Sequence, residues 1–319
     1  MTTDQLSYLV FGIVIVLALV FDLGLLSKKE TEISIKKAFY QAVFWVGLAL
    51  AFFGFLWYEY GQAPALEYLS AYLMEKSLSI DNIFVFILIF TYFRIGSTHI
   101  ARALLWGILM AIVFRVIFIA VGLVLVERFN WLLYVFGAFL LYTGVKIFSA
   151  KEEDQFDPAA SPVYKVINRV FPIIHEDVGG KFSVIRNGKR FYTNLFVVVV
   201  MLSFTDIVFA LDSIPAVFAI VTDSPQRNLI IYTSNIFAVL GLRSLFFVLK
   251  GAVNRFSYLQ QGIAIVLVFI GAKMLIPLVY KGFHMPVTIS LLVILVCLGG
   301  SILYSIQVAK RKPNENDLI

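Results

Sequence analysis

The sequence contains little charge and almost no cysteine. Of its 319 residues, 14% are charged and 61% are hydrophobic, whereas roughly a quarter of the residues of an ordinary soluble domain are charged. The single cysteine, Cys297, excludes a disulfide framework within the chain and a thiolate-based metal site. The three histidines, His99, His175 and His284, fall in predicted loops far apart in sequence, which disfavours zinc and copper. The composition therefore indicates a protein whose solvent is lipid.

Nine apolar runs are long enough to cross about 30 Å of hydrocarbon as helices, the conformation that lipid requires of single spans. They cover residues 8–26, 40–58, 69–93, 101–126, 131–149, 193–222, 230–250, 260–280 and 286–308. These runs predict an all-α polytopic membrane protein that forms a single transmembrane domain over residues 1–319.

The basic residues predict the orientation of these spans. Eighteen lysines and arginines lie in one alternating set of connections and three lie in the other. Because basic connections are retained on the cytoplasmic side, the N-terminus is expected outside and the C-terminus in the cytoplasm. Membrane topology also explains the net charge of +6, so the lipid bilayer is the expected partner and nucleic acid is not.

The longest polar connection, residues 150–192, is predicted to be cytoplasmic. It ends in alternating residues around Asn187-Gly188, and both of these residues tolerate the positive φ angles of a type I′ turn. A small cytoplasmic β-hairpin is therefore expected at this position.

Ionisable residues recur along the apolar runs at a nearly constant offset. Glu75 and Asp81 are six positions apart, as are Asp206 and Asp212; Arg115 precedes Arg243 by 128 positions and Lys146 precedes Lys273 by 127. The recurrence divides the chain into two N-terminal helices (8–58), a first three-helix repeat (69–149), a second (193–280) and a C-terminal helix (286–308). Since three is odd, the two repeats are predicted to be inverted, as in many secondary transporters.

Intramembrane carboxylates are the candidate functional residues, because a charge at the bilayer centre costs about 2.5–3.5 kcal/mol on insertion scales and normally faces a cavity or a partner. The predicted metal ligands are Glu75, Asp81, Asp206 and Asp212, assisted by Asn82 and Asp22, with Arg115 and Arg243 as counter-charges. Oxygen ligands suit hard cations such as Mg²⁺, Ca²⁺ and Mn²⁺. The ion is expected to be transported, and no tightly bound cofactor is expected.

The spacing within each acidic pair constrains this site. Six residues rotate a helix by about 600°, so the two carboxylates point some 120° apart on an unbroken helix. They would converge only if the helix breaks. Pro215 cannot donate a hydrogen bond to the carbonyl of Leu211, so it is the predicted helix break of the second repeat.

Structural ion pairs are the alternative to a transport site. Pairs such as Asp81 with Arg115 or Asp212 with Arg243 would hold helices together without moving an ion. An intramembrane aspartyl protease is disfavoured because the chain lacks a Gly-x-Gly-Asp motif. No enzyme activity is therefore expected.

Two stretches resemble hallmark motifs of the TerC family, most closely those of its Alx-type bacterial members. They read Glu75-Lys-Ser-Leu-Ser-Ile-Asp-Asn-Ile-Phe-Val-Phe86 and Phe204-Thr-Asp-Ile-Val-Phe-Ala-Leu-Asp-Ser-Ile-Pro-Ala-Val-Phe218. The resemblance covers nearly the whole chain and includes Gly-Leu-Arg at 241–243. It implies a bacterial inner-membrane protein related to the LysE-type exporters and linked to manganese efflux, alkaline-pH response and tellurite resistance. The acidic motif positions of the family fall on Glu75, Asp81, Asp206 and Asp212.

Together, the residues and the resemblance predict a manganese exporter whose cycle is coupled to protons. Two alternatives stay open at this stage. One is an amino-acid exporter of the LysE type, and the other is a membrane factor that assists the metalation or assembly of other proteins. Assembly of the chain into a homo-oligomer is open as well.

Overall fold

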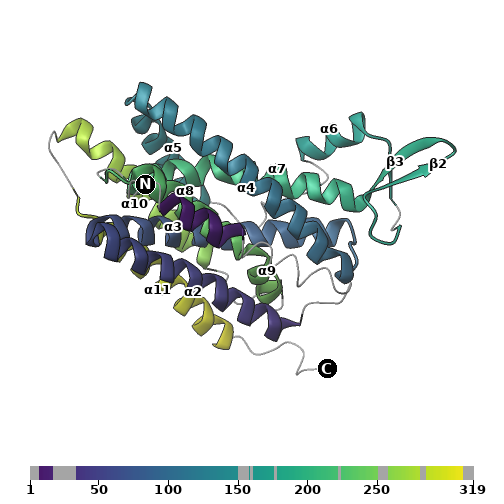
Figure 1. Ribbon diagram of the computed structural model, residues 1–319, viewed down its shortest axis with the longest axis horizontal. Coiled ribbons are helices and arrows are strands. Elements are labelled where there is room, and N and C mark those ends of the chain that lie inside the picture. Colours follow the sequence, from purple (N-terminus) through teal and green to yellow (C-terminus); the bar gives the residue numbers. More distant parts are fainter. Residues whose placement is uncertain are drawn as a thin grey trace.

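The computed structural model describes residues 7–16, 34–149, 158, 161–175, 178–221, 224–250, 258–280 and 285–311, without the side chains of Asp81, Ser149 and residues 309–311. These residues form a mainly helical bundle with a small sheet at one end (Figure 1). A helix over Ser7–Val16 is followed by α2 (Ile35–Tyr60), α3 (Gln62–Tyr92), α4 (Ser97–Arg128), α5 (Leu132–Ser149), α6 (Pro162–Val170), α7 (Asn194–Ile220), α8 (Arg227–Leu240), α9 (Leu242–Lys250), α10 (Leu259–Val279) and α11 (Val287–Arg311).

Six segments of the described chain are long and apolar enough to cross a membrane. They are Ile35–Tyr60, Ser97–Arg128, Asn194–Ile220, Arg227–Lys250, Leu259–Val279 and Val287–Val308. The predicted span 69–93 corresponds to α3, which ends one residue earlier, is 31 residues long and carries the charged acidic motif. The predicted span 131–149 corresponds to the shorter α5, and only residues up to Val16 of the span 8–26 are described. Among the described residues, length and composition therefore support six of the nine predicted spans, and the other three stay predictions.

The predicted β-hairpin is confirmed. Strand β2 (Ser183–Arg186) pairs antiparallel with β3 (Lys189–Thr193), and Arg186 faces Lys189 across the turn. Asn187 and Gly188 have φ angles of 51° and 75°, as a type I′ turn requires. The sequence did not predict β1 (Ile173–Ile174), which pairs parallel with β3 on its other side, or the short helix α6. The hairpin projects beyond the end of α7 (Figure 1).

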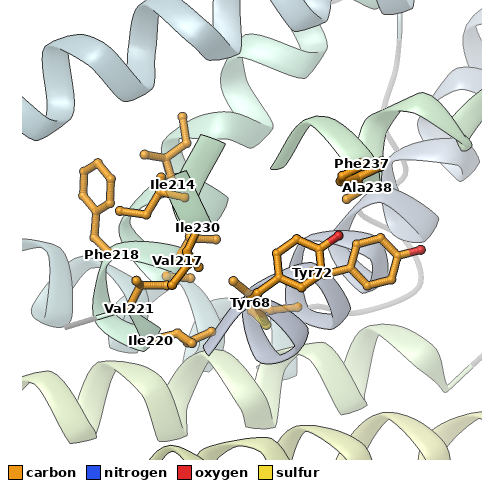
Figure 2. Close-up of a cluster of buried hydrophobic side chains, with 14 of the residues drawn as sticks. Tyr68, Tyr72, Ile214, Val217, Phe218, Ile220, Val221, Ile230, Phe237 and Ala238 are labelled. Atoms are coloured by element: carbon orange, nitrogen blue, oxygen red, sulfur yellow. The ribbon is translucent and has the colours of Figure 1, made fainter. Parts of the chain in front are cut away.

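A buried apolar cluster joins α3 to α7 and α8 in the middle of the bundle (Figure 2). Tyr68 and Tyr72 of α3 stack with their rings 6.2 Å apart, and Tyr68 meets Phe237 of α8 edge to face at 6.4 Å. Ile214 and Phe218 of α7 belong to the same cluster. Close packing of this kind has few low-energy alternatives, so it fixes α3, α7 and α8 relative to one another.

Helices α5 and α10 approach each other through glycines. A Cβ atom at Gly137 would lie 3.2 Å from the carbonyl oxygen of Gly271, and one at Gly144 would lie 2.8 Å from that of Ala264. Small residues let helix backbones come this close in a membrane. The contact positions rise along α5 while they fall along α10, so the two helices pack antiparallel.

Helix α7 continues through Pro215, so the predicted helix break at this residue is wrong. The break lies instead at Gly241, which separates α8 from α9 within the predicted span 230–250. Proline removes one hydrogen bond from a helix but does not end it when neighbouring helices hold the surrounding turns. Pro215 is itself buried in the tightly packed part of α7.

Candidate functional site

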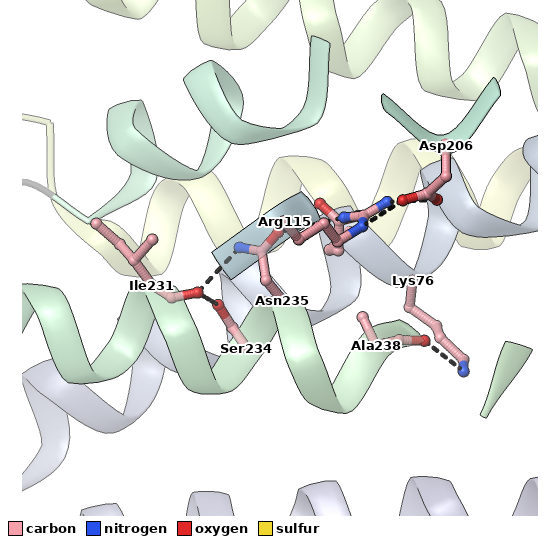
Figure 3. Close-up of polar contacts among 8 residues, drawn as sticks. Lys76, Arg115, Asp206, Ile231, Ser234, Asn235 and Ala238 are labelled. Carbon is pink, nitrogen blue, oxygen red and sulfur yellow. Dashed lines mark hydrogen bonds and ion pairs between the residues drawn. The ribbon is translucent and has the colours of Figure 1, made fainter. Parts of the chain in front are cut away.

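The guanidinium of Arg115 lies between two carboxylates that belong to different helices, and Figure 3 shows its contact with Asp206. From α4, its Nε donates to Oδ2 of Asp206 on α7 at 2.9 Å, and its Nη2 donates to Oδ1 of the same residue at 3.0 Å. Its Nη1 donates to Oε1 of Glu75 on α3. A two-pronged contact between arginine and carboxylate is both strong and geometrically specific. The site therefore ties α3, α4 and α7 together.

The pattern of α4 explains why this arginine points inward. Val113, Ile117 and Val121 lie on one face of the helix and are exposed, as expected of side chains that contact lipid. Arg115 lies on the opposite face, one turn before the buried Ile119. An arginine among apolar residues on an inward face needs compensating partners, and the two carboxylates supply them.

The three charged groups are almost entirely enclosed. The exposed fractions of Glu75, Arg115 and Asp206 are 0%, 1% and 3%. Two carboxylates and one guanidinium leave one excess negative charge, which is costly in an apolar interior. Oε2 of Glu75 has no hydrogen-bond partner among the residues that the structure describes. The site therefore has an unused acceptor and the charge balance to take a further cation or a proton.

Asn235 on α8 completes the arrangement, and the sequence did not predict it. Its Oδ1 accepts a hydrogen bond from Nη1 of Arg115 at 3.3 Å, while its Nδ2 donates to the carbonyl of Ile231 at 3.0 Å. Asn235 is fully buried. An amide in the middle of the apolar run 230–250 was the signal that could have identified it, since buried polar groups need partners.

Lys76, the neighbour of Glu75 in the sequence, reaches a different helix. Its Nζ donates to the carbonyl oxygen of Ala238 at 3.1 Å, close to the C-terminal end of α8 (Figure 3). The break at Gly241 ends α8 there, and a Cβ atom at Gly241 would lie 2.8 Å from that Nζ. Helix C-termini carry partial negative charge and favour cations. Lys76 therefore stabilises the end of α8 beside the carboxylate site.

The second acidic pair does not converge on the same group. Oδ1 of Asp212 accepts from Oγ1 of Thr143 on α5 at 3.4 Å, and Lys146, one turn along α5, interacts with it electrostatically. Because α7 is continuous, Asp206 and Asp212 point in directions about 120° apart. The predicted convergence of both on one ion is therefore absent from this arrangement.

The other predicted ligands and counter-charges are distributed as follows. Asn82 on α3 and Arg243 on α9 are both buried, with exposed fractions of 3% and 2%. Asp22 and the side chain of Asp81 lie outside the described part of the chain. Within that part, no group of three or more histidine, cysteine, aspartate or glutamate residues is placed to hold a metal ion. The carboxylate pair around Arg115 is thus the central feature of the site.

There is little free space beside the site. The cavity that borders Asp206 is lined otherwise by apolar residues, including Phe86 and Leu202, and its volume is about 10 Å³. This is about the space that one water molecule needs.

Two of the three histidines come together, although they are far apart in sequence. His99 at the start of α4 and His175 after β1 line one pocket at the end of the molecule that carries the sheet. Their separation in the sequence was therefore a poor guide to their separation in space.

Comparison with known proteins agrees with the membrane architecture. The family model described as "Integral membrane protein TerC family" matches residues 60–313. The chain is 42% identical over 302 residues to an uncharacterized membrane protein of Myxococcus xanthus, covering 95% of this chain and 92% of that one. It is 42% identical over 290 residues to a putative membrane-bound redox modulator Alx of Salmonella typhi, covering 88% of each. No solved structure matches the chain significantly. The chain therefore belongs to the TerC family of integral membrane proteins, as its two acidic motifs indicate.

Proposed function

We propose that this protein transports a divalent metal cation, manganese foremost, through the carboxylate pair around Arg115. The observation that carries the proposal is the meeting of Glu75, Asp206 and Arg115 from three helices in a closed, apolar environment. Ionisable residues within membrane segments are retained mainly where they serve an ion or a proton.

The donor atoms suit a hard cation. Both oxygens of Asp206, one oxygen of Glu75 and the amide oxygen of Asn235 already converge on the guanidinium. Carboxylate and amide oxygens are the ligands of Mg²⁺, Ca²⁺ and Mn²⁺. The choice of manganese among them rests on the family resemblance, because these ions share the same donors.

Arg115 acts in this proposal as a resident counter-charge that the ion replaces. With arginine between them, the two carboxylates keep one excess negative charge; with a divalent cation in its place, they are neutral. Exchange of the two cations lets the site empty without leaving both carboxylates uncompensated. Uptake of a proton by the unused oxygen of Glu75 would couple metal movement to the proton gradient.

Contacts between α5 and α10 support an inverted-repeat transport architecture. At the offset of 127 that relates Lys146 to Lys273, Gly137 corresponds to position 264 and Gly144 to position 271. The close approaches join Gly137 to Gly271 and Gly144 to Ala264, so each is the symmetry counterpart of the other. Two equivalent helices that pack antiparallel in this reciprocal way are related by an axis perpendicular to both. Secondary transporters use such an axis in the membrane plane, with the ion site where the repeats meet.

The most direct test measures manganese flux in proteoliposomes that contain the purified protein. Native protein is expected to move Mn²⁺ down an imposed gradient, and Glu75→Gln and Asp206→Asn are each expected to reduce the initial rate at least tenfold. Glu59→Gln removes an exposed acid at the end of α2 and is expected to leave the rate unchanged. A rate that survives both site substitutions at equal protein density would contradict the proposal.

The coupling to protons has its own measurement in the same vesicles. An enclosed pH indicator is expected to report proton movement opposite to metal movement in native protein. Metal flux with no change of internal pH at any imposed gradient would remove the coupling and leave the ion site in place.

Two other functions are less well supported. An amino-acid exporter would need a free cationic group to bind the carboxylate of its substrate. Arg115 is already bonded to Glu75 and Asp206, and these two acids would repel a substrate carboxylate. The name of the Salmonella typhi relative describes a redox modulator, but one cysteine cannot form a disulfide within this chain. A role in metalating other proteins would show as a loss of partner metalation without a change in total cell metal.

A further inference from the structure

A pocket of about 600 Å³ opens at the end of the molecule that carries the sheet, away from the carboxylate pair. Its walls come from the end of α3, the start of α4, helix α6, the segments beside the sheet and the start of α7. Aromatic rings form one side of it. The ring centroid of Tyr164 lies 5.4 Å from that of Phe93 and 6.4 Å from that of Tyr92. The proposed ion site does not use this pocket.

The charge of the lining is of one sign. Arg94, His99, His175 and Lys181 line the pocket, and among its described lining residues there is no aspartate or glutamate. Glu176 and Asp177, which follow His175 in the sequence, lie outside the described residues. A concave surface lined by cationic and imidazole groups concentrates anions.

Arg94 occupies a position that would favour glycine. It has a φ angle of 50°, in the left-handed region. Its N–H donates to the carbonyl oxygen of Thr91, and the N–H of Ile95 donates to the carbonyl oxygen of Phe90. Helices that end with this pair of hydrogen bonds usually have glycine at the position of Arg94. The adjacent Gly96 has a φ angle of −57° and does not need to be glycine for this reason. Unfavourable conformations of this kind concentrate at functional sites, so the arginine side chain itself is the feature to explain.

The segment that carries Lys181 is held in place by several contacts. Arg102 donates to the carbonyl of Gly180 at 3.0 Å and lies over the ring of Phe182 at 5.0 Å. Gly180 lies so close to His99 that a Cβ atom there would be 2.6 Å from its Nδ1. The Thr193 hydroxyl donates to the carbonyl of Lys181 at 2.6 Å. These contacts fix the backbone from which Lys181 extends, before any ligand binds.

We propose that this pocket binds a phosphate-bearing anion through Arg94 and Lys181, with His99 and His175 beside it. Arginine binds phosphate through paired N–H donors and lysine through a point charge. The phosphate has two sources that this position could reach: a free phosphate compound in water, or the headgroup of an anionic lipid at the membrane boundary where α3 ends and α4 and α7 begin. Basic pockets at the ends of membrane helices bind lipid headgroups in this way.

Thermal stability of the purified full-length protein in a neutral detergent tests the proposal. The two probes are inorganic phosphate and a short-chain phosphatidylglycerol, each compared with a chloride salt or a short-chain phosphatidylcholine at the same ionic strength. Native protein is expected to melt at a higher temperature with at least one probe. A shift with phosphate assigns a free anion, and a shift with phosphatidylglycerol alone assigns a lipid headgroup.

Variants separate binding from folding. Arg94→Gly suits the left-handed backbone, so it is expected to fold as well as the native protein and yet bind at least tenfold more weakly. Lys181→Gln is expected to weaken binding similarly. Lys189→Gln removes an exposed charge from the hairpin outside the pocket and is expected to bind normally. No shift with either probe, or equal binding by native protein and both pocket variants, would overturn the proposal, as would an equal loss in Lys189→Gln.

Discussion

Replacement of Arg115 by methionine removes the counter-charge but fills the same space with an unbranched side chain of similar length. Glu75 and Asp206 would then be two buried carboxylates without a cation, at exposed fractions of 0% and 3%. Breaking a buried ion pair from one side costs about 3–5 kcal/mol. Because a change of 1 kcal/mol moves the melting temperature of a mid-sized domain by roughly 2–4 °C, we expect Arg115→Met to melt on the order of 10 °C below native protein in detergent.

Two further measurements show whether charge is the cause. A triple variant that also carries Glu75→Gln and Asp206→Asn leaves no charge in the site, so it is expected to recover most of the lost stability. Mn²⁺ at about one hundred times its dissociation constant is expected to stabilise Arg115→Met by about 2.7 kcal/mol and to leave the triple variant unchanged. If Arg115→Met melts with the native protein, or the triple variant is no more stable than Arg115→Met, the reasoning is refuted.

Three other substitutions probe the surrounding structure. Gly271→Ala places a Cβ atom 2.7 Å from a backbone oxygen of α5, so it is expected to lower the stability of the protein by about 1–3 kcal/mol through overpacking. Gly54→Ala has open space around it and is the matched control. Equal melting temperatures of the two variants would contradict the close packing of α5 and α10. Lys76→Met removes the donor to Ala238, and faster hydrogen exchange at the end of α8 is expected; unchanged exchange would remove its positioning role. Asp212→Asn keeps the contact to the α5 hydroxyl. Because Asp212 points away from Arg115, the substitution is expected to change Mn²⁺ affinity by less than about threefold. A tenfold loss, which corresponds to about 1.4 kcal/mol, would place Asp212 in the site.

The sequence predicted the elements whose cause is local. The hairpin followed from Asn187-Gly188, whose backbone conformation depends on those two residues alone. The membrane character and most of the long apolar helices followed from composition. The count of nine spans stays a prediction, because α3 carries the charged motif, α5 is short, and most of the run 8–26 lies outside the described residues.

The site required information that lies between helices. Glu75, Asp206 and Arg115 were identified from their cost in lipid, but which acids Arg115 contacts depends on the packing of α3, α4 and α7. The helix break was assigned to Pro215 because proline lacks a donor, whereas the chain breaks at Gly241, beside the half-buried Lys76 contact. Asn235 was missed because one amide in an apolar run gives no spacing pattern.

Metal content of cells tests the central claim most directly. Mn, Mg, Ca, Fe and Zn are measured by mass spectrometry in manganese-loaded cells that express either native protein or the double variant Glu75→Gln plus Asp206→Asn, at equal membrane abundance. A manganese exporter that works through this carboxylate pair lowers manganese alone, and the double variant does not. If native protein changes no metal, or the double variant lowers manganese as well as native protein does, the carboxylate pair around Arg115 is not the transport site.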